Sequence, residues 1–496
     1  MRWLLLIGSS LCFFSCQPTF VADNWEVTIN NSGSSSSPKA TDLNGDGILD
    51  IIIGSGAQEF KSTPHGVLAL DGKDGSTLWQ ISTRNQIVGT PLLINANDDD
   101  TQDVLIGGRS AELNLIDGKT GTVIWEYMKD DPNADLINDT LILNFFNPQL
   151  CPDIDGDGRQ DIIISYGGFI KAKPDVTERP QGYLLAISSK DGRELVRMPA
   201  PDRKEIYCSP VLTTIADDQL SILFGTGGET IGGGFYAIDF SDFKSHQFDK
   251  ISTLTVDSAK GFIAPPTIVD MNNDGQKDII VNAVNGKIIC ISGSDLSILW
   301  QANIGDGYEG YAMSCPGYFY GDDDILDIVT SYGYGPWPDT KFTSNILIDG
   351  RDGSIVYKDS LGTFQYASPI AYNFDNDKVD DIIIATNHPI TTTLTNTKFP
   401  TTFLGNDLSI HNFMQNQSTL LRPTKIGSNL GSTPLLIDVD GDGYLDIISC
   451  YMTDPKNFYS FSKMVIERIE LKHKKLSTFN WNSYMGVATD AIDHRE

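Results

Sequence analysis

Six short loops rich in aspartate and asparagine contain the residues of this chain best suited to chemistry. Four share one nine-residue pattern, at 42–50 (DLNGDGILD), 153–161 (DIDGDGRQD), 270–278 (DMNNDGQKD) and 438–446 (DVDGDGYLD), and looser copies occupy 95–103 and 373–381. Acidic or amide side chains at positions 1, 3, 5 and 9, with the backbone carbonyl of position 7, offer oxygen ligands around one point. Such a ligand set suits a hard cation, and we predict calcium.

The predicted metal ligands are the residues at the odd positions of each loop. They are Asp42, Asn44, Asp46, Ile48, Asp50, Asn95, Asn97, Asp99, Thr101, Asp103, Asp153, Asp155, Asp157, Arg159, Asp161, Asp270, Asn272, Asp274, Gln276, Asp278, Asn373, Asp375, Asp377, Val379, Asp381, Asp438, Asp440, Asp442, Tyr444 and Asp446. An EF-hand is excluded because that motif needs an acid at position 12, which is absent from all six loops. Occupancy is expected to vary, with 153–161 and 438–446 richest in carboxylates and with Asp100 and Lys378 weakening the looser copies. The expected role of the ions is structural.

A repeating set of strands must position these loops. Most loops are followed at once by a β-branched run, as in residues 50–53 and 161–164, and then by a hairpin, as in 66–79 and 113–125. Such short runs, bounded by turn residues, are typical of buried strands. Four strands in each of eight units, two of which have lost the loop pattern, predict an all-β, eight-bladed β-propeller of four-stranded antiparallel blades, with seven blades as the alternative.

The two ends of the chain are predicted to close the ring together. Residues 24–29 read as the last strand of a unit without the three strands that should precede it. We expect them to join the final sheet beside residues 464–471 and 476–481, because a shared blade leaves fewer exposed sheet edges.

Two known repeat families resemble the two halves of each unit. The Asp-loop half resembles the FG-GAP repeats of integrin α-subunit propellers and their bacterial relatives. The hairpin half, in which Trp79 and Trp125 follow Asp-Gly and Thr-Gly turns, is similar to the tryptophan-docking repeat of eight-bladed quinoprotein-like propellers, a group that includes the outer-membrane lipoprotein of the barrel-assembly machinery. The resemblance implies a propeller over 25–485, a C-terminal tail at 486–496, and packing between blades for Trp79, Trp125, Trp300 and Trp481. It implies no quinone cofactor, because the adjacent cysteines of the quinone enzymes are missing.

The N-terminus predicts export. Residues 1–15 carry one early arginine and then a short apolar run, which is typical of a secretory signal peptide. Ser15 and Cys16 resemble the lipobox of bacterial lipoproteins, which implies a lipid on Cys16, a linker over 16–24 and a place on the bacterial cell envelope, facing the periplasm or the surface. The alternative is a secreted protein. Five further cysteines are scattered among apolar residues and are expected to be buried free thiols: Cys151, Cys208, Cys290, Cys315 and Cys450.

The net charge and the long insertions limit the kinds of partner that this chain can bind. The net charge of −29 argues against nucleic acid as a partner and restricts membrane contact to the lipid anchor. Insertions between the second and third strands are expected on the face opposite the Asp loops, near the channel: 55–65, 167–181, 225–234, 333–343, 388–402 and 451–462. They carry aromatic residues that suit a protein or polysaccharide ligand: Phe60, Phe169, Tyr332, Tyr334, Trp337, Phe399, Tyr451, Phe458 and Tyr459.

No catalytic motif stands out in the sequence. The six histidines are scattered, and no nucleophile elbow is present. We therefore predict a non-catalytic binding or scaffold propeller. The alternatives are a secreted polysaccharide-active enzyme, since some rhamnogalacturonan lyases resemble this plan, and an outer-membrane assembly factor by analogy of fold.

Overall fold

The computed structural model describes most of the chain. The described residues are 24–97, 99–127, 143–169, 173, 176–216, 219–321, 323–337, 339–375, 377–393, 400–453, 455–457, 460–479 and 481–495. The predicted signal peptide and the predicted lipid site at Cys16 lie outside these residues. Each described thiol, at Cys151, Cys208, Cys290, Cys315 and Cys450, is free and buried, which confirms that expectation.

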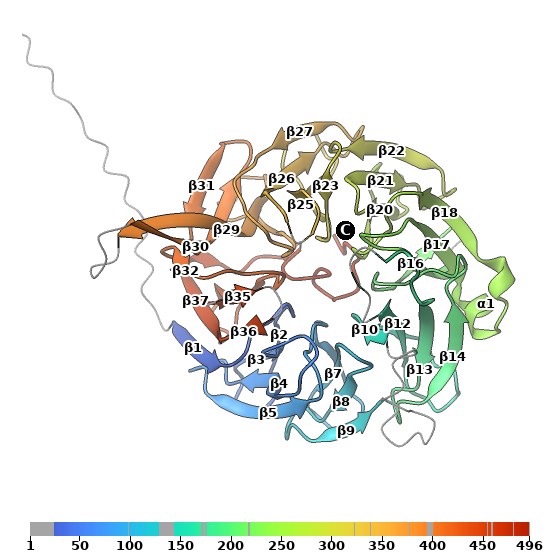
Figure 1. The fold of residues 1–496 in the computed structure, drawn as a ribbon, viewed down its shortest axis with the longest axis horizontal. Coiled ribbons are helices and arrows are strands. Elements are labelled where there is room, and N and C mark those ends of the chain that lie inside the picture. Colours follow the sequence, from blue (N-terminus) through green and yellow to red (C-terminus); the bar gives the residue numbers. More distant parts are fainter. Residues whose placement is uncertain are drawn as a thin grey trace, which may run out of the picture.

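Eight sheets of four or five strands form a closed ring in the described part of the chain (Figure 1). The first two, from inner to outer strand, are β2 (Lys39–Thr41), β3 (Asp50–Gly54), β4 (Thr63–Leu70) and β5 (Thr77–Thr83), then β6 (Leu92–Ile94), β7 (Asp103–Gly107), β8 (Leu113–Ile116) and β9 (Val123–Glu126). The third has β10 (Leu143–Phe145) and β11 (Gln149–Cys151) inside β12 (Asp161–Phe169), β13 (Tyr183–Ile187) and β14 (Glu194–Pro199). The fourth has β15 (Val211–Ile215), β16 (Gln219–Gly225), β17 (Gly233–Asp239) and β18 (Ser252–Asp257), with the short helices α1 (Phe240–Lys244) and η1 (Phe248–Lys250).

The other four blades repeat this plan. The fifth is β19 (Thr267–Val269), β20 (Asp278–Asn282), β21 (Lys287–Ile291) and β22 (Ile298–Asn303). The sixth has β23 (Tyr308–Glu309) and β24 (Cys315–Gly317) inside β25 (Asp327–Tyr334), β26 (Phe342–Ile348) and β27 (Ile355–Lys358). The seventh is β28 (Ile370–Tyr372), β29 (Asp381–Thr393), β30 (Pro400–Asn412), β31 (Gln417–Leu420) and β32 (Lys425–Ile426). The eighth is β33 (Leu435–Ile437), β34 (Tyr444–Met452), β37 (Lys463–Lys475) and β1 (Trp25–Asn30), beside a small hairpin of β35 (Pro455–Asn457) and β36 (Ser460–Phe461). The chain is thus an all-β, eight-bladed β-propeller.

Strand β1 closes the ring as the outer strand of the eighth blade. It pairs antiparallel with β37, from Trp25 opposite Arg468 to Asn30 opposite Lys463, as the sequence predicted. The expected further strand at 476–481 is wrong, because β37 ends at Lys475 and Trp481 instead forms an isolated bridge with Ala371 of β28. The final blade is therefore built from three C-terminal strands and one N-terminal strand.

The β-branched runs after the Asp loops form the second strand of each blade. Residues Ile51, Ile52 and Ile53 of β3 are fully buried, and so are Ile162, Ile163 and Ile164 of β12. Both faces of such a strand pack against neighbouring blades, which explains why the run is continuously apolar rather than alternating. This packing gives each Asp loop a rigid base.

Tryptophans join neighbouring blades on the side of the Asp loops. The indole Nε1 of Trp79 donates to Gly118 O of the next blade at 2.7 Å, and Trp125 donates to Ser189 O at 2.9 Å. Trp300 donates in the same way to Gly350 O at 2.8 Å. The sequence reading missed a fourth member, Trp25, which donates to Gly72 O at 2.8 Å and so ties the closing strand to the first blade.

The C-terminal segment crosses the inner strands of several blades. Leu436 N of β33 donates to Asn482 O, and Ile268 N of β19 donates to Ala491 O, both at 2.9 Å. Lys39 of β2 donates from Nζ to Ser483 Oγ at 2.7 Å, and burial lowers its pKa to about 7. The segment ends near the middle of the ring (Figure 1). The residues from 486 onward, expected as a tail, thus include side chains as buried as Ala491.

Candidate functional site

The Asp loops connect the first and second strands of the blades and share one hydrogen-bond pattern. In the loop 42–50, Asp42 accepts bonds from Gly45 N at 2.7 Å and Gly47 N at 2.9 Å. Asn44 and Asp46 each accept a bond from the amide two residues further along. The same bonds recur in 153–161 and 438–446. Position 6 has a positive φ, +85° at Gly47, which explains the glycine in the clear copies.

The aspartate at position 9 anchors each loop to the blade. Asp50 Oδ2 accepts a bond from Leu43 N at 2.9 Å, and Oδ1 accepts one from Gly72 N of the hairpin between the third and fourth strands at 3.1 Å. Burial raises the pKa of Asp50 to about 6. Asp103 and Asp278 make equivalent pairs of bonds. Asp327, in a unit whose loop pattern is lost, does the same with Tyr320 N and Gly350 N, so this anchor survives without the loop motif.

The loop 153–161 gathers carboxylates most closely around one point. Ligand atoms of Asp153, Asp155 and Asp161 lie within 4.8 Å of one another. Asp161 is fully buried; its Oδ2 accepts a bond from Ile154 N at 2.7 Å, and the backbone of Ser189 lies close enough to lower its pKa. Burial and the nearby carboxylates of Asp155 and Asp153 raise its pKa. Three converging carboxylates, of which Asp155 is paired only with the exposed Arg193 at 2.6 Å, fit a bound cation.

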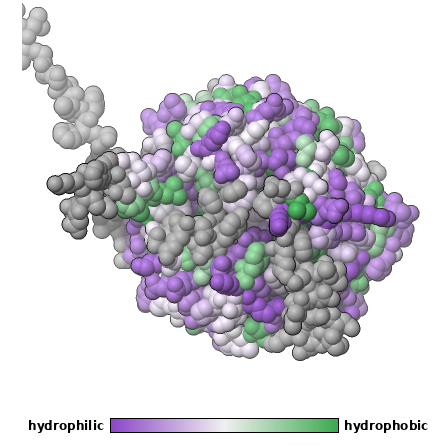
Figure 2. All heavy atoms as spheres, viewed as in Figure 1, coloured by the Kyte–Doolittle hydropathy of each residue, from purple (hydrophilic) through white to green (hydrophobic). Residues whose placement is uncertain are grey.

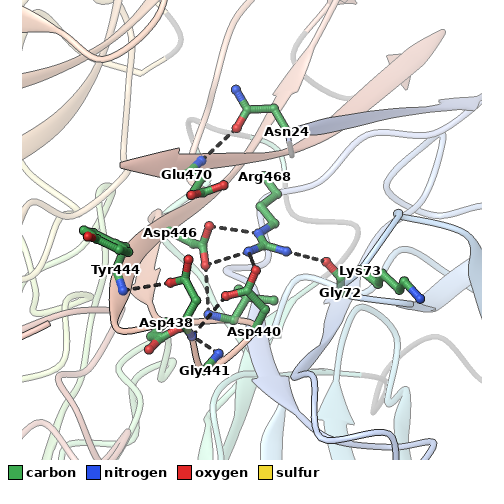
Figure 3. A network of polar contacts seen from close by, with 12 residues as sticks. Asn24, Gly72, Lys73, Asp438, Asp440, Gly441, Tyr444, Asp446, Arg468 and Glu470 are labelled. Atoms are coloured by element: carbon green, nitrogen blue, oxygen red, sulfur yellow. Dashed lines mark hydrogen bonds and ion pairs between the residues drawn. The ribbon is translucent and has the colours of Figure 1, made fainter. Parts of the chain in front are cut away.

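The loop 438–446 has the same sequence pattern and a different partner. Asp438, Asp440 and Asp442 also bring ligand atoms within 4.8 Å, but Asp446 is not in this group. Arg468 of β37 donates from Nε to Asp446 Oδ1 at 2.8 Å and from Nη2 to Asp440 Oδ2 at 2.6 Å (Figure 3). The eighth blade takes its outer strand from the N-terminus and so lacks the hairpin that supplies an amide elsewhere. Arg468 provides that missing donor, together with a positive charge.

The remaining loops bring fewer carboxylates together. Among the described residues the close groups of three acids are the two just named, so 42–50, 95–103, 270–278 and 373–381 show none. In 95–103 the Asn97 amide donates to Asp103 and to Asp117, and in 373–381 Asp381 accepts a bond from Asn412 at 2.9 Å. Whether each predicted ligand binds an ion stays a prediction.

A cup lies at the ring axis on the face opposite the Asp loops. Its cavity volume is about 270 Å³, and all eight blades contribute to its lining. Residues before the inner strands line it, among them Ser35, Val88, Phe146, Tyr207, Ile263, Tyr311, Tyr366 and Gly431. Insertions add Glu59, Trp337 and Phe461, and the C-terminal segment adds Tyr484. In Figure 2, hydrophilic residues predominate among the coloured surface of the ring and hydrophobic ones form small patches, so a recessed site rather than a broad apolar face is the candidate for binding.

Polar groups form one side of the cup. Arg109 Nη2 and Glu59 Oε1 make an ion pair at 2.6 Å, which leaves this side without net charge. Gln86 adjoins this ion pair, because Arg109 N donates a backbone hydrogen bond to Gln86 O at 3.0 Å. The Gln86 side chain is 5% exposed, and its amide makes no hydrogen bond to the described residues.

Aromatic residues form the side contributed by the sixth and seventh blades. Tyr311 and Tyr366 meet edge to face with ring centroids 4.5 Å apart, and Trp337 lies 5.3 Å from Tyr366. Glu309 fixes this wall, because its Oε2 accepts bonds from Tyr311 OH and from Trp337 N, both at 3.1 Å. Lys260 balances the charge of Glu309. The wall is therefore held in place before any ligand arrives.

The predicted insertion aromatics differ in their surroundings. Trp337 lines the cup, and its role in binding stays a prediction. Tyr332 and Tyr451 are buried packing residues, Tyr334 stacks on Phe342 with centroids 5.0 Å apart, and Phe60 is exposed. Phe399, Phe458, Tyr459 and the side chain of Phe169 lie outside the described residues. The insertion at 388–402 is an extension of the β29–β30 hairpin, which projects from the ring (Figure 1).

The sequence reading missed most of the cup, although a signal was present. Each unit opens with a proline, and the residue three positions earlier lines the cup in six of the eight units: Ser35, Val88, Tyr207, Ile263, Tyr366 and Gly431. This position lies just before the inner strand, where the chain enters the channel. An alignment of the eight units on their prolines would have shown that this position recurs at the same place in each blade, and so that these residues meet at the ring axis.

The fold and the two sites define the class as an eight-bladed β-propeller with acidic loops on one face and a central cup on the other. The family model described as FAM234A/B beta-propeller matches residues 25–232. The chain is similar to protein FAM234B of Homo sapiens, at 23% identity over 395 residues, which cover 72% of this chain and 58% of that protein. It is also similar to FAM234B of Gallus gallus, at 28% identity over 201 residues, which cover 39% of this chain and 30% of that protein. The chain thus spans less than two thirds of either relative.

Solved structures agree on the fold. The quinohemoprotein alcohol dehydrogenase ADHIIG from Pseudomonas putida HK5 matches with a TM-score of 0.53 at 12% identity, over 94% of this chain and 78% of that chain. At this identity the likeness concerns the fold alone, and it confirms the quinoprotein-like propeller. The two curated relatives are vertebrate proteins, so they give no support to the expected bacterial cell envelope. Within the described residues no helix is long and apolar enough to span a membrane.

Proposed function

We propose that this chain is a non-catalytic binding propeller that receives a protein or polysaccharide ligand in the central cup. The observation that carries the proposal is the cavity of about 270 Å³ to which all eight blades contribute. This volume lies just below the range of about 300–1,000 Å³ for small-ligand pockets, so the cup suits one small molecule or the end of a larger chain rather than a bulky ligand. Binding sites on rigid scaffolds commonly lie where loops converge, as they do here.

Calcium in the Asp loops braces the ring in this proposal. The FG-GAP-like pattern and the three converging carboxylates of 153–161 support it. A bound ion would join the first and second strands of a blade at the rim and would neutralise part of the net charge of −29. The role proposed for calcium is structural, because the cup lies on the opposite face.

A lipid on Cys16 is the proposed tether. The apolar run before Cys16 and the lipobox-like Ser15 support it, and they are also the support for a cell-envelope location. Mass spectrometry of the mature N-terminus tests this, since a diacylglyceryl group on Cys16 is expected. An unmodified N-terminus at another residue would instead favour the secreted alternative.

Filling the cup tests the binding proposal. Val88 is half-buried and lines the cavity, so Val88→Trp occupies it with a large ring. Ser35→Trp does the same from another blade, and Lys73→Trp, in an exposed hairpin turn on the Asp-loop face, is the matched control. On arrays of polysaccharides and of extracellular proteins we expect wild type and Lys73→Trp to bind the same ligand and both cup variants to lose it.

A polysaccharide-degradation assay on the same proteins separates binding from catalysis. We expect no change in chain length of the bound polysaccharide. Release of unsaturated oligosaccharides by wild type would show the lyase-like alternative to be right. Unchanged array binding by both folded cup variants would show that the ligand site lies elsewhere.

A further inference from the structure

We propose that the cup binds a single uncharged sugar ring, the terminal unit of a glycan; this rests on the proposed function. The geometry that points to it is the pairing of one unsatisfied amide with a fixed aromatic wall across the channel. Gln86 lies between the first and second blades, whereas Trp337 and Tyr366 belong to the sixth and seventh. In the ring, β7 of the second blade and β25 of the sixth lie on opposite sides of the axis (Figure 1), and Gln86, Trp337 and Tyr366 all line the cavity.

The unsatisfied amide selects a ligand that can hydrogen-bond. The Gln86 side chain is 5% exposed, lines the cavity and has no hydrogen bond among the described residues. An amide that lines a cavity and is not engaged by the chain can bond an occupant that offers both a donor and an acceptor. A hydroxyl group does both, whereas the apolar side chain of a protein partner would leave the amide unpaired.

Charge balance selects an uncharged ligand. The carboxylate of Glu59 is paired with Arg109, and that of Glu309 is paired with Lys260. No excess charge is left to attract a carboxylate, a phosphate or an ammonium group. The paired side chains can still accept or donate additional hydrogen bonds, which suits a ligand with several hydroxyl groups.

Asn147, the other amide in the lining, is already satisfied. Asn147 accepts a bond from Thr90 N at 2.7 Å and donates to Ser209 Oγ at 2.9 Å and Tyr484 OH at 3.3 Å. Asn147 therefore has little capacity left to hydrogen-bond a ligand, and we expect the hydrogen bonds to a ligand to come from the side of Gln86. The opposite wall of Trp337 and Tyr366 presents aromatic surface, on which the C–H face of a sugar ring can pack.

Replacement of single side chains tests this assignment. Gln86→Leu keeps the size of the side chain and removes the amide, and Trp337→Leu removes the large ring. Gln301→Leu makes the first substitution at an exposed position of β22 and is the matched control. The probes are the methyl glycosides of glucose, mannose, galactose and N-acetylglucosamine, and methyl glucuronide serves as the charged comparison.

Saturation-transfer NMR and intrinsic tryptophan fluorescence measure binding of these probes to the soluble chain. We expect at least one neutral glycoside to bind wild type and Gln301→Leu equally, with about tenfold weaker binding to Gln86→Leu and to Trp337→Leu. Methyl glucuronide should bind more weakly than the matching neutral sugar.

Three results would overturn the assignment in distinguishable ways. If no glycoside binds but Val88→Trp abolishes array binding to a protein, the cup is a binding site for another class of ligand and only the sugar assignment fails. If glycosides bind equally to wild type, Gln86→Leu and Val88→Trp, they bind outside the cup, and both this inference and the proposed site fail. Preference for the glucuronide would show that an anionic sugar is the ligand.

Discussion

The loops 153–161 and 438–446 have nearly the same sequence pattern, but different groups contact their negatively charged aspartates. Each offers four aspartates in the same turn, with the same hydrogen bonds from its glycine amides. In the first, three carboxylates converge, and no lysine or arginine among the described residues pairs with the position-9 aspartate, Asp161. In the second, the position-9 aspartate is engaged by an arginine that is 2% exposed. Both loops thus meet an arginine of the chain, but Arg193 is exposed and contacts Asp155 alone, whereas Arg468 is buried and also engages the position-9 aspartate.

The difference follows from how the ring closes. A blade made of consecutive strands has a hairpin whose amide reaches the position-9 aspartate, as Gly72 N reaches Asp50. The eighth blade cannot have that hairpin, because its outer strand comes from the other end of the chain. Arg468 bonds Asp440 and Asp446 within the blade and also donates to Gly72 O of the first blade at 3.2 Å. The blade that closes the ring is thereby tied to its neighbour without depending on calcium.

Removing the guanidinium of Arg468 should have the largest effect. Arg468→Met keeps the apolar stem and leaves Asp446 buried without its counter-charge, and breaking a buried pair by removing one partner costs about 3–5 kcal/mol. We expect that loss in the free energy of unfolding, measured by urea titration in chelator. Adding Asp446→Asn should recover part of it, because the uncompensated charge is then gone. An unfolding midpoint equal to that of wild type would show that Arg468 does not support the blade.

The stabilisation that calcium gives should differ between variants of the two loops, by less than the loss expected for Arg468→Met. A ligand at ten times its dissociation constant stabilises a folded protein by about 1.4 kcal/mol for each site. Asp155→Asn removes a carboxylate from the cluster of three in 153–161, so the stabilisation gained on adding calcium should fall by about that amount relative to wild type. Asp440→Asn, at the same position of 438–446, should lower stability with and without calcium.

Urea titration with and without calcium measures how much calcium stabilises wild type and each variant, and two outcomes would contradict the prediction. Equal increments in wild type and Asp155→Asn would place the bound calcium in other loops. A full loss of the increment in Asp440→Asn alone would reverse the assignment of the two loops.

The sequence was sufficient to predict the fold because the repeat is local and regular. The Asp loops, the β-branched runs and the hairpin turns recur together, and they gave the blade count, the strand order and the closure by residues 24–29. The prediction failed where a segment leaves the repeat. Residues 476–481 have strand-like composition, but Trp481 pairs with Ala371 because the inner strands offer amides that the C-terminal segment can satisfy.

The sites were only partly predictable because they depend on contacts between distant residues. The loop motif identified the acidic ligands, but nothing in the local sequence distinguishes Asp161 from Asp446. The distinction comes from Arg468, which is placed opposite Ile448 by the register of β34 and β37. The cup depends on residues from all eight blades, which are far apart in the chain and meet at the axis. Trp337 was found because it lies in an insertion, whereas Gln86 lies in an ordinary connection between blades.

Replacement of Arg193 should have the smallest effect and gives the sharpest control for the role of burial. Arg193 Nη2 contacts Asp155 Oδ2 at 2.6 Å, the same distance at which Arg468 contacts Asp440, but the Arg193 side chain is 56% exposed rather than 2%. Exposed ion pairs contribute about 0–1 kcal/mol, because water and salt screen them. We therefore expect Arg193→Met to change the free energy of unfolding by less than about 1 kcal/mol, with a smaller change at high salt. If urea titration gave the same loss for Arg193→Met as for Arg468→Met, then the distance to the carboxylate rather than burial would decide the strength of these pairs, and the contrast between the two loops would disappear.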